Sequence, residues 1–259
     1  MSQIIAIHSF RGGTGKSNLT ANLAVEIAQQ GHRVAIVDTD LQSPGIHALF
    51  SIDETIPAKT LNDYLWNRSL INDIACDISS HLEINDKGKV FLIPSSMNTS
   101  EIARIIGEGY NVSLLNNGFR RLIAELELDY LFIDTHPGLS RETLLSIAIA
   151  DQLIILLRPD RQDFQGTAVT VDVARQLKAQ NMMLVINKVP QKIDFYALQQ
   201  NVEKNYKVPV AAILPLSEDM LLLGSSGIFC LKYPHHYLTQ IIKDISQKII
   251  LNKSFAAAI

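Results

Sequence analysis

The sequence predicts an α/β fold, a doubly wound and mostly parallel sheet with helices on both faces. Short apolar runs of strand character alternate with helical stretches long enough to be crossover connections. A glycine-rich segment joins the first strand to the first helix, and polar residues follow several later strands. The chain has 259 residues without repeats, low-complexity stretches or linkers. We therefore expect one domain over residues 1–252 and a tail at 253–259.

In the first half, the strands are expected from continuous buried runs and the helices from apolar residues on one face. Leu19, Leu23, Ala24 and Ile27 share a helix face, and Gly31 ends that helix. Leucine and isoleucine spacing indicates short helices further on, and Asn85 to Gly88 has turn chemistry. The expected strands are 4–7, 33–38, 90–94 and 129–134, with a short run at 81–84, and the expected helices are 46–50, 60–78, 99–106 and 112–127.

In the second half, strands and helices alternate regularly, which requires crossovers and therefore a parallel arrangement. The expected strands are 152–157, 182–187 and 209–214, and the expected helices are 140–150, 164–180, 194–205 and 235–252. In the last helix several isoleucines form an apolar side with lysines nearby, either as a helix docked on the core or as a weakly basic membrane helix.

The composition is that of a globular protein and argues against a membrane-spanning one. The chain is 47% hydrophobic and 19% charged, which is ordinary for a globular protein with a large core. It has no run of 18 apolar residues, and we expect no signal sequence, because the N-terminus starts directly on the first strand. Cys76 and Cys230 are far apart without metal-ligand spacing, so we expect reduced thiols and a cytoplasmic location.

The charge is distributed unevenly. The net charge is −3, yet from Phe164 onward there are ten Lys and Arg against six Asp and Glu. This bias is either ordinary variation or a weak contact surface for an anionic partner.

The segment from Phe10 to Asn18 indicates a phosphate-binding loop. It lies between a strand and a helix, the context that such a loop requires. Its glycines let backbone N–H groups converge on an anion, Lys16 would reach the β- and γ-phosphates, and Ser17 would bind Mg²⁺. The usual P-loop glycine four residues before the Gly-Lys-Ser falls at Phe10-Arg11, so this loop is a deviant form. The expected nucleotide-binding residues here are Arg11, Gly12, Gly13, Thr14, Gly15, Lys16, Ser17 and Asn18.

Asp134 follows the buried strand Tyr-Leu-Phe-Ile and has the Walker B position. It would hold Mg²⁺ directly or through water, or it is a capping aspartate at a strand-to-helix turn. His136, two residues later, is either a general base or a solvated or packing residue, and the second interpretation is favoured. Asp38 and Asp40 follow the second strand and would be ionised at neutral pH, which suits polarising water near a metal.

The loop resembles the Lys-Gly-Gly-x-Gly-Lys-Ser/Thr loop of the ParA/MinD family of deviant Walker A ATPases, with Arg11 in place of the first lysine. Asp38-Thr-Asp40, Asp134 to Gly138 and Asn187 match further family motifs, and the resemblance extends from Ile4 to about Ile250. In lacking the signature lysine, the chain resembles the carboxysome-positioning McdA proteins.

This resemblance implies residue roles. One of Asp38 and Asp40 would orient the attacking water, and the other would support the Mg²⁺ shell or the lysine network. The expected metal-binding residues are Ser17, Asp38 and Asp134. Gly138 would sense the γ-phosphate and Asn187 would recognise adenine, although Asn187 is also typical of a turn. Arg11 would reach the partner subunit's nucleotide, or another basic residue such as Arg158, Arg161 or Lys188 would do so.

The resemblance also implies an activity and partners. Family members are ATP- and Mg²⁺-dependent ATPases that form ATP-sandwich homodimers, position cargo on DNA or membrane, and hydrolyse ATP slowly until a partner protein stimulates them. We expect catalysis by Arg11, Lys16, Asp38 and Asp40, non-specific DNA as the preferred surface, and a nucleoid-associated location. A MinD-like membrane protein is the first alternative, and a nitrogenase iron-protein or tyrosine-kinase relative is disfavoured by the positions of the cysteines and tyrosines.

Overall fold

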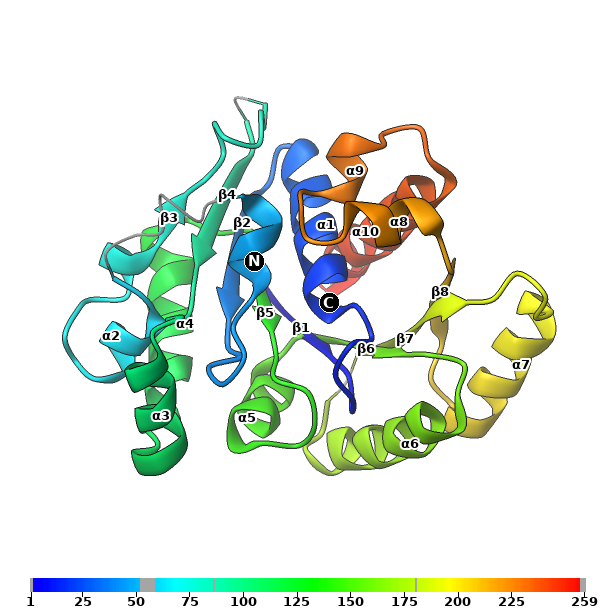
Figure 1. Ribbon diagram of the computed structural model, residues 1–259, viewed down its shortest axis with the longest axis horizontal. Helices are drawn as coiled ribbons and strands as arrows, with labels where there is room; N and C mark the ends of the chain where they lie inside the picture. The colour runs from blue at the N-terminus through cyan, green and yellow to red at the C-terminus, as the bar shows by residue number, and fades with distance from the viewer. Residues whose placement is uncertain (1, 52–58, 86, 180, 257–259) are drawn as a thin grey trace.

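An eight-stranded sheet forms the centre of the computed structural model, which describes residues 2–51, 59–85, 87–179 and 181–256, with side chains as far as Asn252. The strand order is β3-β4-β2-β5-β1-β6-β7-β8 (Figure 1). Neighbouring strands are parallel except for β3, which pairs antiparallel with β4. The predicted mostly parallel sheet is confirmed. Its strands are β1 (Gln3–His8), β2 (Arg33–Asp38), β3 (Cys76–Asp77), β4 (Lys89–Ile93), β5 (Tyr130–Asp134), β6 (Gln152–Leu157), β7 (Met182–Val189) and β8 (Val210–Pro215).

Helices cover both faces of the sheet, because alternate residues of the central strands point to opposite sides. Ile5 and Ile7 of β1 belong to a core cluster with α1, α9 and α10, whereas Ala6 belongs to a cluster with α5, α6 and α7. A third cluster packs α2 and α4 against β2, β4 and β5. The helices are α1 (Lys16–Gln29), α2 (Leu61–Leu65), α3 (Thr99–Glu108), α4 (Ser113–Glu125), α5 (Arg141–Ile149), α6 (Arg161–Gln176), α7 (Phe195–Tyr206), α8 (Glu218–Leu223), α9 (Phe229–Lys232) and α10 (Tyr237–Ala256), with 3₁₀ turns η1 (Ile46–Phe50) and η2 (Asn72–Ile74).

The structure corrects several expected elements. The region 60–78 contains α2 and η2, but Cys76 and Asp77 form the edge strand β3, and Cys76 pairs with Leu92. The run at 81–84 is a turn followed by irregular chain, and β7 continues two residues past Asn187. The prediction has no counterpart of α8 and α9, which occupy the connection between β8 and α10 (Figure 1).

The last helix is docked on the core. Ile242, Ile245 and Ile249 are buried in the cluster that also contains α1. The docked interpretation is therefore confirmed, because the apolar side of α10 is already covered by protein. The helix runs to Ala256, beyond the expected end at residue 252, while residues 257–259 of the expected tail lie outside the described residues. Within the part of the chain that the structure describes, no helix combines the length and apolar character needed to cross a membrane.

Candidate active site

The predicted site residues meet at the carboxyl edge of the sheet. β1 lies between β5 and β6 and leads into the glycine-rich loop, while Asp38 ends β2 and Asp134 ends β5. The chain leaves β1 toward β2 on one side and returns to β6 on the other, so the loop lies at a topological switch point of the sheet. Ligands of open α/β sheets bind at such points.

The loop has the backbone conformation of an anion cradle. Gly13 and Gly15 adopt φ angles of 74° and 100°, which favour glycine. The Thr14 hydroxyl donates to Ser9 Oγ at 2.9 Å, which ties the loop to the residue that follows β1. The helix α1 then begins at Lys16 without an acidic side chain in its first turn. Its N-terminal N–H groups and partial positive charge therefore remain available to a phosphate.

Residues of β7 hold the loop from the side. The Asn187 amide donates to the Thr14 carbonyl at 2.8 Å, and Lys188 Nζ donates to the Gly13 carbonyl at 2.8 Å. A Cβ on Gly15 would lie 2.6 Å from Asn187 Nδ2, so a side chain there would displace this amide. Asn187 thus shapes the loop, a contact that its predicted role as the adenine-recognising residue did not include.

The ring of Phe10 packs directly on Gly166 of α6, where a Cβ would lie 2.2 Å from the ring. We expect Gly166→Ala to lower the free energy of unfolding by about 1–3 kcal/mol, because Phe10 and the loop must shift. Gly107→Ala in α3 is the matched control, because its Cβ would meet open space and helix propensity favours alanine. Thermal unfolding of both variants tests this expectation, and equal melting temperatures would contradict it.

Two buried carboxyl groups lie side by side beneath the loop. Asp38 and Asp134 are register partners on β2 and β5, and their relative exposures are 0% and 2%. Asp38 accepts hydrogen bonds from the backbone N–H groups of Asp40 and Gly45. Thr20 of α1 donates to Asp134 at 3.3 Å, a partner that the sequence motif does not identify. The structure thus brings the predicted metal-binding carboxylates together.

Burial dominates the electrostatics of this pair. It raises the pKa of Asp38 well above its usual range, and the neighbouring Asp134 raises it further. Burial likewise raises the pKa of Asp134 to about 6, although Ser17 and Lys16 oppose the shift. The pKa of Lys16 is lowered by its own burial and supported by Asp134, Asp40 and Asp38. Lys16 thus provides the positive charge that compensates the closely spaced carboxyl groups of Asp38, Asp40 and Asp134.

These residues fit a magnesium–nucleotide complex. Mg²⁺ in nucleotide sites is held by one or two carboxylates, a hydroxyl and substrate phosphates rather than by an all-protein cage. Asp38, Asp134 and Ser17 offer this donor set, and the described residues contain no group of three His, Cys, Asp or Glu that could hold a metal by itself. When bound, the metal would neutralise phosphate charge.

Two further predicted residues border the cradle. Gly138, with a φ of 82°, donates its N–H to the Ser9 carbonyl at 3.2 Å. Asp40 lies beyond β2, where His136 Nδ1 approaches its Oδ1 to 2.7 Å. The favoured interpretation of His136 as a solvated or packing residue omitted this contact.

Arg11 points away from its own loop. Its guanidinium lies 3.8 Å from Asp160 and 3.7 Å from Asp163 at the start of α6, and 41% of the side chain is exposed. Of the other basic candidates, Arg158 pairs with Asp163 at 2.9 Å and Lys188 is bonded to the loop, whereas Arg161 at the start of α6 is exposed. Arg11 is therefore a half-exposed cation at the edge of the cradle.

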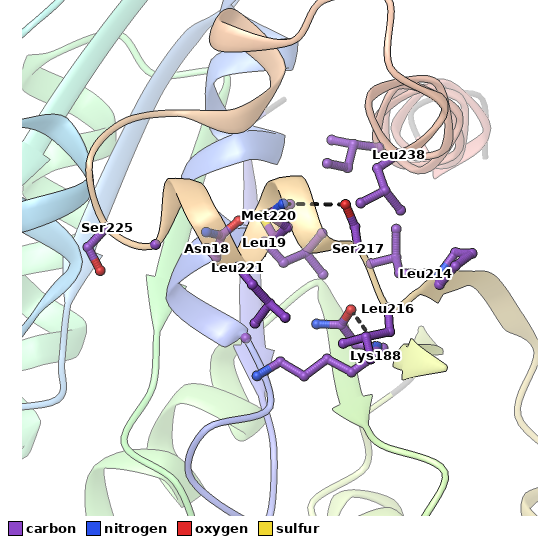
Figure 2. A pocket seen from close by; sticks show the side chains of 15 residues that line it. Asn18, Leu19, Lys188, Leu214, Leu216, Ser217, Met220, Leu221, Ser225 and Leu238 are labelled. Carbon is purple, nitrogen blue, oxygen red and sulfur yellow. Dashed lines mark hydrogen bonds between the residues drawn. The ribbon is translucent and has the colours of Figure 1, made fainter. Parts of the chain in front are cut away.

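A mostly apolar pocket of about 290 Å³ adjoins the loop. Figure 2 shows the side chains of Leu19, Leu214 and Leu221 around it, with Lys188 along one side. Its position beside Gly15 and Asn187 suits the base of a nucleotide whose phosphates occupy the cradle. Pro215 at the end of β8 and Ser217 in the following loop also line the pocket, and so does α8, which the prediction missed. Ser217 caps α8 through Met220 N–H, and Ser-Glu-Asp before a leucine run is the signal that indicates this helix.

The fold and this site define a P-loop nucleotide-binding protein of the deviant Walker A class. The family model described as an AAA domain matches residues 2–207. The chain belongs to this ATP-binding family, in its ParA/MinD group, which confirms the resemblance found in the sequence. A curated relative, an uncharacterized ATP-binding protein of Methanocaldococcus jannaschii, is 27% identical over 96% of this chain and 88% of its own length.

Solved structures share the fold. The septum site-determining protein MinD of Pyrococcus horikoshii, complexed with Mg-ADP, is 20% identical with a TM-score of 0.78 and covers 96% of each chain. Apo McdA of Cyanthece is 17% identical with a TM-score of 0.73, over 96% of this chain and 100% of that one. A relative of another kind, the cytosolic Fe-S cluster assembly factor CFD1 of Chaetomium globosum, is 30% identical over 68% of this chain and 57% of its own length.

Proposed function

We propose that this protein is an ATP-dependent dimerising ATPase that positions or segregates cellular cargo, with its slow hydrolysis stimulated by a partner protein. The observation that supports ATP hydrolysis best is the buried arrangement of Lys16, Asp38 and Asp134 beneath a phosphate cradle. Charge neutralisation, a held Mg²⁺ and an oriented nucleophile are what phosphoryl transfer to water requires. In this proposal Lys16 and the loop neutralise the phosphate charge. Ser17, Asp38 and Asp134 hold Mg²⁺, and Asp40 orients the attacking water.

Arg11 supports the homodimer. It is half-exposed and forms ion pairs at 3.7–3.8 Å with Asp160 and Asp163 at the start of α6, a geometry that contributes little stability. A guanidinium held so loosely is free to bind phosphate oxygens of a nucleotide in the partner subunit. In this proposal ATP completes the contact across the interface, and ADP does not.

Non-specific DNA is the surface that we propose for the ATP-bound dimer, with a nucleoid-associated, cytoplasmic location. The last third of the chain has the excess of basic residues, which suits contacts with phosphates. A MinD-like membrane contact is the alternative, but the apolar side of α10 is buried against the core. An iron–sulfur function is disfavoured, because Cys76 lies on the edge strand β3 and Cys230 is buried on α9 beside Asn22.

The test measures oligomer mass and DNA binding together. We expect a monomer with ADP and Mg²⁺, and with ATP and Mg²⁺ a dimer that binds a random-sequence duplex. DNA binding, measured by fluorescence anisotropy, should weaken steeply as salt rises. Arg11→Ala should still bind ATP but remain monomeric and fail to bind DNA. Equal DNA binding with ADP and ATP would contradict the switch. An Arg11→Ala variant that still forms the ATP-dependent dimer would contradict the role of Arg11.

A further inference from the structure

His136 and Asp40 form a direct side-chain pair between two segments of the site. His136 belongs to the segment from Asp134, the last residue of β5, to Gly138, and Asp40 belongs to the loop after β2. The Nδ1–Oδ1 distance is 2.7 Å, and the two side chains are 26% and 16% exposed. A carboxylate oxygen only accepts hydrogen bonds, so Nδ1 carries the hydrogen and donates it. The contact therefore requires a hydrogen on Nδ1.

The His136 contact engages only one carboxylate oxygen of Asp40, Oδ1. Oδ1 accepts from His136 and also from the Ser43 N–H at 3.0 Å. Two donors satisfy the two lone pairs of Oδ1, which fixes the plane of the carboxylate and directs further donors to Oδ2. The backbone N–H of Asp40 is itself bonded to Asp38 Oδ1 at 3.0 Å. Asp40 is thus held at both its backbone and its side chain, next to the buried carboxylates.

His136 is anchored in turn by its own segment. Its carbonyl oxygen accepts from the Thr143 hydroxyl of α5 at 3.1 Å. Two residues further on, Gly138 donates its N–H to Ser9 of the phosphate loop. The His136 ring therefore links Asp40 to a segment that is bonded both to α5 and to Ser9 before the phosphate loop.

We propose that His136 is a positioning residue for ATP hydrolysis: it holds Asp40 by Oδ1, so that Oδ2 orients the attacking water. This inference rests on the proposed ATPase function and adds a residue to it. A water-orienting carboxylate must be fixed to a fraction of an ångström, because small misplacements of reacting groups cost about 100-fold in rate. The ring also links that carboxylate to the segment that contains Gly138.

Kinetics separate this role from a structural one. We expect His136→Ala to lower kcat by about tenfold or more while KM for ATP changes by less than about threefold. His136→Asn should recover most of the rate, because its amide N–H can take the place of Nδ1–H. In an Asp40→Ala background, His136→Ala should have no further effect. His32→Ala is the matched control, since His32 lies 3.5 Å from Asp129 at the opposite edge of the sheet, and its kcat should be unchanged.

A second readout does not depend on activity. In the nucleotide-free protein at pH 8, ¹⁵N NMR should show His136 protonated at Nδ1, and Asp40→Ala should shift the ring toward Nε2–H. An Nε2–H ring in the unmodified chain, or a normal kcat for His136→Ala, would overturn the inference while leaving the ATPase intact. No ATP hydrolysis by the unmodified chain would instead overturn the proposed function and this inference together.

Discussion

Lys16→Ala is expected to reduce ATP affinity by about 100-fold or more and to abolish ATP-dependent dimers. Lys16 is 7% exposed, and in the free protein its charge compensates Asp38 and Asp134. A bound polyphosphate would bring more negative charge to the same place. Without the ammonium group, two buried carboxylates and the phosphates would repel one another, so binding would lose both an attraction and a shield.

The variant has a defined measurement and control. Fluorescent ATP-analogue titration gives the affinity, and light scattering gives the mass with ATP and Mg²⁺. Lys204→Ala removes an exposed lysine of α7 and should leave both unchanged. Circular dichroism checks folding, which should persist because the aspartates can take up protons. ATP binding within about twofold of the unmodified chain would show that the cradle is not the nucleotide site.

Asp134→Asn is expected to abolish Mg²⁺-dependent nucleotide binding and to stabilise the nucleotide-free protein at neutral pH. The pKa of Asp134 is raised from 3.8 to about 6 by burial. Between these values the folded protein binds a proton more tightly than the unfolded chain, so the contribution of this group to stability is lost as pH rises from about 4 to about 6. The ionised form costs at most about 3 kcal/mol above that window, and asparagine removes this cost.

Thermal unfolding at two pH values tests the sign. At pH 7.5 the variant should melt several degrees above the unmodified chain, and the difference should shrink at pH 5. Asp151→Asn is the control, because Asp151 accepts the Ile4 N–H at the opposite edge of the sheet and lacks the buried neighbours. A variant that is less stable than the unmodified chain at pH 7.5 would contradict the raised pKa of Asp134. So would a gain in melting temperature that grows on acidification.

The sequence predicted what depends on local pattern. The central strands are continuous apolar runs that form only when both faces are covered, and the loop glycines require conformations that other residues avoid. The predicted carboxylates Asp38 and Asp134 meet because parallel strands place their carboxyl ends at one edge. In this part of the site, residue type and position along the chain were sufficient.

What the sequence could not predict depends on packing between distant segments. The two-residue strand β3 exists because Cys76 meets Leu92, a pairing that a two-residue stretch cannot signal. Arg11 fits the loop motif, yet its side chain turns toward Asp160 and Asp163 at the start of α6. The ring of His136 meets Asp40 across 96 positions, so a lone histidine in a loop gave no indication of its partner.

The bond from Asn187 to the Thr14 carbonyl spans 173 positions, and β1 itself is paired on both sides by later strands. During synthesis, the phosphate loop therefore leaves the ribosome long before the strands that hold it. Domains fold as units once their interacting segments are present. A nascent chain that ends before β7 lacks the side supports of its loop, so the nucleotide site forms late. We therefore expect a chain that ends before β7 not to bind nucleotide.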